Sequence, residues 1–218
     1  EFNRQVEWAD IVHYHFPWPF ADVLHFLGRV NKPTIITYHS DIVRQQGLLS
    51  IYQPLMNRFL ASVNRIIATS PNYVESSEVL QNNLSKTHVV PIGIDEFVED
   101  DAYEDTLNLT RERIGQGFFF FVGVLRYYKC LHILIAAAEN QNFRVVIAGE
   151  GPLESELKKL AASESFRNVE FVGRITDSEK IACFDLCKAV VFPSFERSEA
   201  FGVTLLEGSM RSKPLITA

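Results

Sequence analysis

Apolar runs of strand length recur along the whole chain and alternate with longer segments of helical periodicity. The runs lie at residues 11–15, 34–38, 65–69, 88–92, 118–122, 144–148, 169–172, 189–193 and 215–218. Strands buried on both faces are typically apolar throughout rather than at every second position. Their alternation with helical segments predicts βαβ units and a parallel sheet covered by helices on both sides. We therefore expect an α/β fold.

An acidic segment interrupts this pattern between the fourth and fifth runs. Residues 95–105 are rich in Asp and Glu and have little capacity to form a core, so we interpret them as an interdomain linker. The 218 residues, 47% of them hydrophobic, suffice for one large or two small domains. We expect a first domain over residues 1–108 and a second over residues 109–218.

The two ends of the chain depart from the usual pattern of a parallel α/β domain. Such a domain normally opens with a strand and its glycine-rich turn, whereas the run at residues 11–15 resembles a middle strand. The sequence also stops inside the run at residues 215–218. We therefore expect a fragment truncated at both ends.

Composition and charge exclude several classes of function. The net charge is −6 and no basic stripe is present, which argues against nucleic acid as a partner. No apolar stretch reaches the ~18 residues that a membrane span requires. Three cysteines without secretory context indicate a reducing, cytoplasmic environment, and Cys183 and Cys187 are expected to pack rather than bind metal. His13 and His15 share a strand face, but no third ligand is evident, so we expect no metal site.

Two carboxylates follow the eighth apolar run. Glu199 and Glu207 have seven residues between them and flank the step from Phe201 to Gly202. A strand, a short polar loop and a helix beginning near Gly202 would place Glu199 in a crevice at the strand's carboxyl end, beside the amides of the helix start. Glu207, about two turns further along, can face the same ligand. This arrangement suits a phosphorylated, hydroxyl-rich ligand.

Three other strand ends carry polar or glycine-rich clusters. Arg126 and Lys129 follow Gly123 and can hold a diphosphate, although a solvated loop is the alternative. Gly149 belongs to a turn that either allows close approach of a ligand or only reverses the chain. The third cluster, Gly173-Arg174-Ile175, can lend backbone groups to a nucleobase. Because parallel strands end at one edge, four such clusters predict a ligand lying across that edge.

The ordered set of motifs resembles the donor-binding domain of the retaining GT-B glycosyltransferases of family four. Its members are Gly123, Arg126, Lys129, the Gly149 turn, Gly173-Arg174-Ile175, Pro193-Ser194 and the pair Glu199 and Glu207. Residues 91–95, with the sequence PIGID, resemble the segment that joins the two domains of that family. The resemblance implies two Rossmann-like doubly wound domains that face a cleft: an acceptor-side domain over residues 1–108 and a donor domain over residues 109–218.

The resemblance also implies a role for each site residue. Arg126 and Lys129 would neutralise the nucleoside diphosphate, and Glu207 would bind the ribose hydroxyls. Glu199 and the backbone of Ala200, Phe201 and Gly202 would hold the transferred sugar and the distal phosphate, and Gly149, Arg174 and Ile175 would line the nucleotide site. Residues 34–40 match a strand whose terminal His39 faces the sugar. The expected reaction, carried by Glu199, His39, Arg126 and Lys129, retains the anomeric configuration and needs neither metal nor cofactor beyond a GDP- or UDP-linked sugar.

The acceptor side is less defined. Residues 44–60 mix large apolar residues with a few cations and can lie on a membrane surface, where a polyprenyl-linked glycan would be the acceptor. A helix facing the core is the alternative. Residues 38–45 look most like bacterial surface-polysaccharide enzymes, notably the mannosyl- or rhamnosyltransferases of O-antigen assembly. That resemblance implies a cytoplasmic protein that contacts the cytoplasmic face of the inner membrane.

Two other functions fit the same motifs. The chain can be a non-catalytic module that binds a nucleotide sugar, which would apply if Glu199 or His39 were misplaced. It can also be another GT-B enzyme, such as a phosphorylase or an epimerase, although these share the fold rather than this order of motifs.

Overall fold

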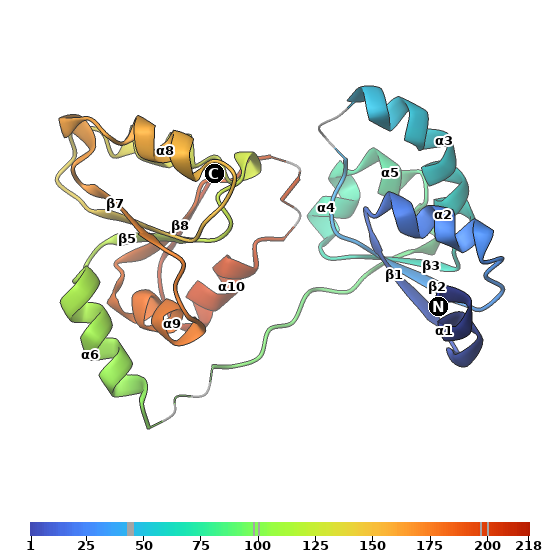
Figure 1. The fold of residues 1–218 in the computed structure, drawn as a ribbon, viewed down its shortest axis with the longest axis horizontal. Coiled ribbons are helices and arrows are strands. Elements are labelled where there is room, and N and C mark those ends of the chain that lie inside the picture. The colour runs from blue at the N-terminus through green and yellow to red at the C-terminus, as the bar shows by residue number, and fades with distance from the viewer. Residues whose placement is uncertain (43–45, 98, 100, 197, 200) are drawn as a thin grey trace. The chain divides into compact units, whose positions relative to one another are not determined.

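The computed structural model consists of two compact units, Glu1–Ile92 and Gly93–Ala218 (Figure 1). It describes residues 1–42, 46–97, 99, 101–196, 198, 199 and 201–218. Residues 93–108 group with the second unit, so the division falls sixteen positions before the expected boundary between residues 108 and 109. None of the described helices is both long and apolar enough to cross a bilayer.

The first unit is built on a four-stranded parallel sheet with the order β1-β2-β3-β4. The strands are β1 (Val12–Phe16), β2 (Thr34–Tyr38), β3 (Arg65–Ala68) and β4 (Thr87–Val89). The helices are α1 (Phe2–Trp8), α2 (Pro19–Leu27), α3 (Gln46–Ser62), α4 (Pro71–Ser76) and α5 (Glu78–Gln81). Figure 1 shows α2 to α5 on one side of the sheet and α1 on the other. Each connection from β1 to β4 leads to the next strand in the same direction, so right-handed crossovers place their helices on one side of the sheet.

Alternation along the strands explains the core of the first unit. Tyr14 and Phe16 of β1, and Ile36 and Tyr38 of β2, are buried at every second position. Successive side chains of a strand point to opposite faces, so these residues share one face. Phe59 of α3 lies edge-on against Tyr14, with ring centroids 5.2 Å apart. The helix α3 therefore does contribute a core-facing side.

The second unit contains a five-stranded parallel sheet with the order β7-β6-β5-β8-β9. Its strands are β5 (Phe119–Val122), β6 (Val145–Ala148), β7 (Val169–Gly173), β8 (Ala189–Phe192) and β9 (Leu215–Thr217). Its helices are α6 (Tyr103–Ile114), α7 (Leu131–Ala137), α8 (Glu154–Leu160), α9 (Asp177–Leu186) and α10 (Val203–Met210). The order of strands reverses between β5 and β8, as in a doubly wound sheet. The four described strands of the first unit instead follow chain order.

Two hydrophobic clusters cover the opposite faces of the second sheet. Phe118 and Phe120 belong to the cluster formed with α6 and α9, whereas Phe121 belongs to the cluster formed with α7 and α8. The run of phenylalanines is therefore buried on both sides, which is why it is apolar at every position. Cys183 and Cys187 are buried free thiols in the first of these clusters, which confirms that they pack in the core.

The acidic segment, residues 95–105, runs into the first turn of α6 and is not only a linker. Phe97 packs against the cluster under α6 and α9, and Tyr103 is buried within it. The hydroxyl of Tyr103 donates a hydrogen bond to Asp185 of α9, and Arg211 forms ion pairs with both Asp185 and Glu99. The expectation that residues 95–105 contribute little to a core was wrong at Phe97 and Tyr103, because two aromatic side chains suffice to dock an otherwise acidic segment.

Candidate functional site

The loops after β5 and β6 are locked together by backbone contacts. Gly149 donates a hydrogen bond from its amide to the carbonyl of Gly173 at 2.7 Å, and Gly123 donates to Ala148 at 3.1 Å. Gly149 has a φ of +120°, and a Cβ added to it would lie 2.1 Å from the carbonyl oxygen of Gly123. Gly149 therefore packs one turn against another, which neither interpretation from the sequence included, and its contact with a ligand stays a prediction.

The same turn supports the segment that carries the two predicted cations. Leu125 donates from its amide to the carbonyl of Glu150 at 2.9 Å and accepts from Leu153 at 3.1 Å. A Cβ on Gly151 would lie 2.6 Å from the backbone of Leu125. The backbone just before Arg126 is therefore fixed from behind by the β6 loop.

Lys129 and Glu199 form an ion pair at the point where the strand order reverses. Their Nζ and Oε2 atoms are 2.5 Å apart, and the two side chains are only 12% and 17% exposed. The Oε2 atom is buried and makes no well-directed hydrogen bond to the described residues, so the contact is ionic in character. Lys129 Nζ also lies 4.8 Å from the ring centroid of Phe192, the last residue of β8. Two predicted site residues from distant parts of the sequence thus meet directly.

Further contacts join the loops after β5 and β8 on either side of this pair. The hydroxyls of Tyr127 and Ser198 are 3.0 Å apart. Ser194 donates a hydrogen bond to the carbonyl of Tyr128 at 2.5 Å. These contacts fix the loops after β5 and β8 relative to each other.

The helix α10 begins directly beside the ion pair. Gly202 precedes its first residue with a left-handed backbone, φ +74° and ψ +61°, and a Cβ there would approach the Phe192 ring to 3.1 Å. The first amides of any helix have no partner inside it and attract negative charge. The predicted helix start near Gly202 is confirmed, whereas the contact of Phe201 and Gly202 with a ligand stays a prediction and Ala200 lies outside the described residues.

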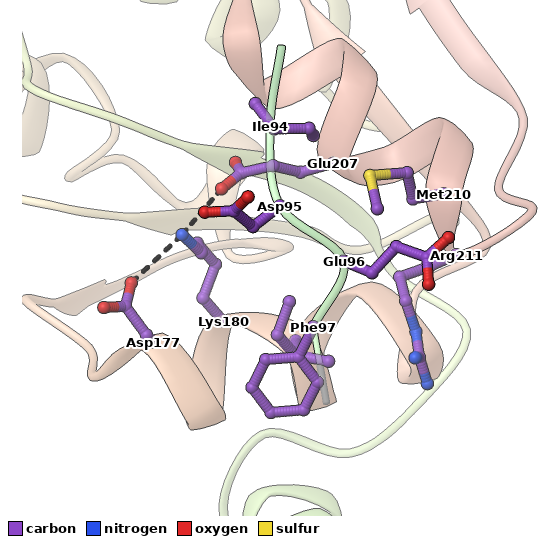
Figure 2. Close-up of a pocket in the computed structure, with 10 residues that line it drawn as sticks. Ile94, Asp95, Glu96, Phe97, Asp177, Lys180, Glu207, Met210 and Arg211 are labelled. Atoms are coloured by element: carbon purple, nitrogen blue, oxygen red, sulfur yellow. Dashed lines mark hydrogen bonds and ion pairs between the residues drawn. The ribbon is translucent and has the colours of Figure 1, made fainter. Parts of the chain in front are cut away.

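Glu207 lies on the same helix and lines a pocket of about 620 Å³ (Figure 2). Lys180 of α9 reaches it, with Nζ 2.7 Å from Glu207 Oε1 and 3.0 Å from Asp177 Oδ1. Burial lowers the pKa of Lys180, but the hydrogen bonds to Glu207 and Asp177 outweigh it and leave that pKa raised. Lys180 was not singled out from the sequence, because a lysine in the second turn of a helix gives no local signal of its partner on another helix.

Arg126 and Arg174 are both exposed, on the loops after β5 and β7. Within the described residues neither has an ion-pair partner, so both charges are available to a ligand. Ile175 packs partly against the cluster under α6 and α9. The proposed contact of Arg174 and Ile175 with a nucleobase stays a prediction.

His39 lies in the first unit, just after β2, in a stack of three histidines. Its Nε2 is 2.7 Å from His15 Nδ1, and His15 stacks on His13 with ring centroids 4.9 Å apart. Burial, together with the neighbouring His15 and His13, lowers the pKa of His39. No cluster of metal-ligating side chains is found in the part of the chain that the structure describes. The role of His39 toward a sugar stays a prediction.

Two family models match the chain. That of the glycosyl transferases group 1 matches residues 108–218, and that of glycosyltransferase family 4 matches residues 2–96. The D-rhamnosyltransferase WbpZ of Pseudomonas aeruginosa is 51% identical over 218 residues, which are all of this chain and 57% of that protein. The O-antigen chain mannosyltransferase C of Escherichia coli is 50% identical over 95% of this chain and 56% of its own length.

Solved structures show the same fold at low sequence identity. Anabaena Alr3699/HepE in complex with UDP-glucose superposes with a TM-score of 0.75 at 20% identity, over 99% of this chain and 61% of its own. Sucrose-phosphate synthase from Thermosynechococcus elongatus superposes with a TM-score of 0.76 at 21% identity, over 99% of this chain and 58% of its own. These similarities confirm the GT-B fold class.

The chain spans a little over half the length of the curated relatives that it matches. The group 1 match nevertheless covers more than half of the chain and includes every described site residue of the second unit. The chain therefore belongs to the glycosyl transferases group 1 family.

Proposed function

We propose that the chain is part of a retaining glycosyltransferase that moves a hexose from a nucleoside-diphosphate sugar to a glycan or polyprenyl-linked acceptor in surface-polysaccharide synthesis. The observation that carries this proposal is the Lys129–Glu199 pair at the point where the strand order reverses between β5 and β8, beside the start of α10. Ligands of open α/β sheets bind at such reversals of strand order. The relatives named as a rhamnosyltransferase and an O-antigen mannosyltransferase support the type of sugar transfer.

The charged groups around the Lys129–Glu199 pair have the signs that a sugar transfer would require. As the bond between the sugar and the diphosphate breaks, negative charge develops on the departing phosphate oxygens. Lys129, Arg126 and the first amides of α10 would stabilise that charge, which is the effect that most accelerates such a step. Glu199, held against Lys129, would orient the sugar and support its developing positive charge. The acceptor hydroxyl would attack from the face that the diphosphate leaves.

In this proposal Arg126 and Lys129 also take the place of a divalent cation. A fixed guanidinium and an ammonium can neutralise a diphosphate without a metal. We expect sugar transfer to continue at an unchanged rate after treatment with a chelator. A rate that falls with chelation and returns with added magnesium would contradict this part of the proposal.

Exposed apolar side chains on α2 and α3 support contact with a membrane surface. Phe20, Val23 and Leu27 form a solvent-facing stripe on α2, and Leu48 and Ile51 form one on the neighbouring α3. Helices with such stripes can lie in a lipid interface, where a polyprenyl-linked acceptor would be found. Sedimentation with vesicles of anionic lipid tests this contact, and Ile51→Asp should weaken it.

The main test separates nucleotide binding from transfer. Lys129→Ala should weaken binding of UDP or GDP, measured by calorimetry, because one of the two phosphate-facing cations is lost. Glu199→Ala should retain nucleotide binding but lose sugar transfer. Lys158→Ala removes a lysine from an exposed Lys–Glu pair on α8 and serves as the matched control. Normal transfer by both site variants would refute the proposed site, and nucleotide binding by a wild-type protein that transfers no sugar would favour a binding module.

A further inference from the structure

The pocket beside α10 has an unusual balance of charge. Four carboxylates line it, those of Asp95, Glu96, Asp177 and Glu207, together with the cations of Lys180 and Arg211 (Figure 2). Both cations are already engaged: Lys180 with Glu207 and Asp177, and Arg211 with Asp185 and Glu99. Because the four carboxylates outnumber the two cations, the pocket is a poor phosphate site. It is suited to groups that donate hydrogen bonds, such as hydroxyls.

Lys180 contacts only one of the two oxygens of Glu207. The hydrogen bond runs to Oε1 at 2.7 Å, and Oε2 makes no hydrogen bond to any residue that the structure describes. The two side chains are each 21% exposed, whereas Asp177, the other partner of Lys180, is 92% exposed. The bond to Glu207 is therefore the better shielded of the two, and it is less weakened by solvent.

We infer that Lys180 is a positioning residue that fixes the Glu207 carboxylate with Oε2 directed toward the ribose hydroxyls of the donor nucleotide. This inference rests on the proposed function and on the predicted role of Glu207, which is to bind those hydroxyls. An ionised carboxylate only accepts hydrogen bonds, and the 2′- and 3′-hydroxyls of ribose can both donate to it. Lys180 reaches Glu207 from a different helix, so the contact also fixes α10 relative to α9 at the level of the pocket.

Without Lys180, the Glu207 carboxylate would bind the ribose hydroxyls less tightly, because its side chain would be free to adopt other rotamers. The end of a glutamate side chain has several rotamers, and a ligand that selects one of them must restrict the others. Lys180 imposes that restriction before the ligand arrives. Its loss should therefore weaken binding of the ribose and leave the diphosphate contacts at Lys129 unchanged.

The test compares nucleotides with and without the ribose hydroxyls. UDP and GDP, each beside its 2′,3′-dideoxy counterpart, are titrated into the wild-type protein and into Lys180→Met. We expect the variant to bind the ribonucleotide about threefold to tenfold more weakly, the range of one hydrogen bond, and to bind the dideoxy compound as the wild type does. Lys180→Arg should keep most of the affinity for the ribonucleotide that Lys180→Met loses, because arginine keeps a donor in reach of Oε1. Lys158→Met, which breaks the exposed pair with Glu154, should change neither affinity.

Two outcomes would overturn the inference in different ways. Equal weakening of both nucleotides by Lys180→Met, or no weakening, would show that Lys180 does not act through the ribose. Thermal melting of Lys180→Met and of a second variant, Lys180→Gln, identifies a general loss of folding. Glu207→Gln reports on the underlying proposal: if it binds ribo and dideoxy nucleotides as the wild type does, the role of Glu207 itself is refuted. If Glu207→Gln loses the preference for ribose and Lys180→Met does not, only the positioning role fails.

Discussion

At the scale of single residues, the Lys129–Glu199 pair has to serve stability as well as ligand binding. Lys129→Met leaves the Glu199 carboxylate without its counter-ion in a site where only 17% of that side chain is exposed. Breaking a buried pair by removing one partner costs about 3–5 kcal/mol, and we expect about 2–3 kcal/mol here because some solvent remains. Denaturant unfolding measures the loss.

The control for this experiment is Lys158→Met, whose pair with Glu154 is an exposed contact four residues apart on one helix. Such pairs are worth only about 0.3–0.5 kcal/mol. The double variant Lys129→Met, Glu199→Gln should recover part of the loss, since neither charge then remains buried alone. Equal losses for Lys129→Met and Lys158→Met would show that the site pair is not shielded.

Gly149 offers a second test at the same scale. Gly149→Ala adds a methyl group 2.1 Å from the carbonyl oxygen of Gly123 at a φ of +120°, so the two loops must separate. Gly117 also has a positive φ, +75°, but the methyl group of Gly117→Ala would meet nothing within 4 Å. The control should cost about 1–2 kcal/mol of unfolding free energy from backbone strain alone. Gly149→Ala should cost at least 1 kcal/mol more, from overpacking, and also weaken nucleotide binding. A similar loss for both variants would contradict the loop-packing role.

At the scale of elements, α2 and α3 are joined by an acid in a buried position. Asp22 of α2 is 1% exposed, and Tyr52 of α3 donates a hydrogen bond to its Oδ2. Burial raises the pKa of Asp22 to about 6, although the bond from Tyr52 lowers it in part. The folded state thus binds this proton more tightly than the unfolded state, whose carboxyl titrates near 3.8.

The sign of the effect on stability follows from this difference. The stabilisation from the bound proton is complete below pH ~4 and is lost as the pH rises to about 6, a change of about 3 kcal/mol. Asp22→Asn cannot titrate, so its unfolding free energy should lack this fall between pH 4 and pH 7. Denaturant unfolding of the first unit between pH 4 and pH 7 measures how steeply the unfolding free energy falls with pH in the wild type and in Asp22→Asn. Parallel pH profiles for wild type and variant would contradict a raised pKa at Asp22.

The strands themselves were largely predictable from the sequence, whereas the sequence does not show which elements lie side by side in the fold. All nine described strands fall within or beside the nine apolar runs. The signal is clearest for β6 and β8, which are buried at every position, because a strand covered on both faces is apolar throughout. The placement of β8 beside β5 has no such local signature, and it is this placement that brings Glu199 to Lys129. The pairing of Lys180 with Glu207 depends on how two helices pack, and so no spacing in the sequence reveals it.

At the scale of the whole molecule, every residue proposed to bind the donor, apart from His39, belongs to the second unit. That unit has its own two hydrophobic clusters and includes Phe97 and Tyr103 from the acidic segment. A chain of residues 93–218 should therefore bind UDP or GDP with an affinity within about threefold of the whole protein. A chain of residues 109–218, which lacks both aromatic residues, should be less stable. Calorimetry measures the nucleotide affinity of the longer chain, and thermal melting compares the stability of the two chains. Loss of binding by the longer chain would place part of the nucleotide site in the first unit.

The reversal of strand order has a consequence for the chain during its synthesis. One edge of β5 pairs with β6, but the other stays open until β8 has left the ribosome, and the contact between Tyr127 and Ser198 spans 71 positions. At 5–20 residues per second this interval lasts roughly 4 to 14 seconds. For that time the nascent chain carries an unpaired, phenylalanine-rich strand edge that another chain can join. Lys129 has no Glu199 to pair with during this interval, so the ion pair of the candidate site forms only after β8 arrives.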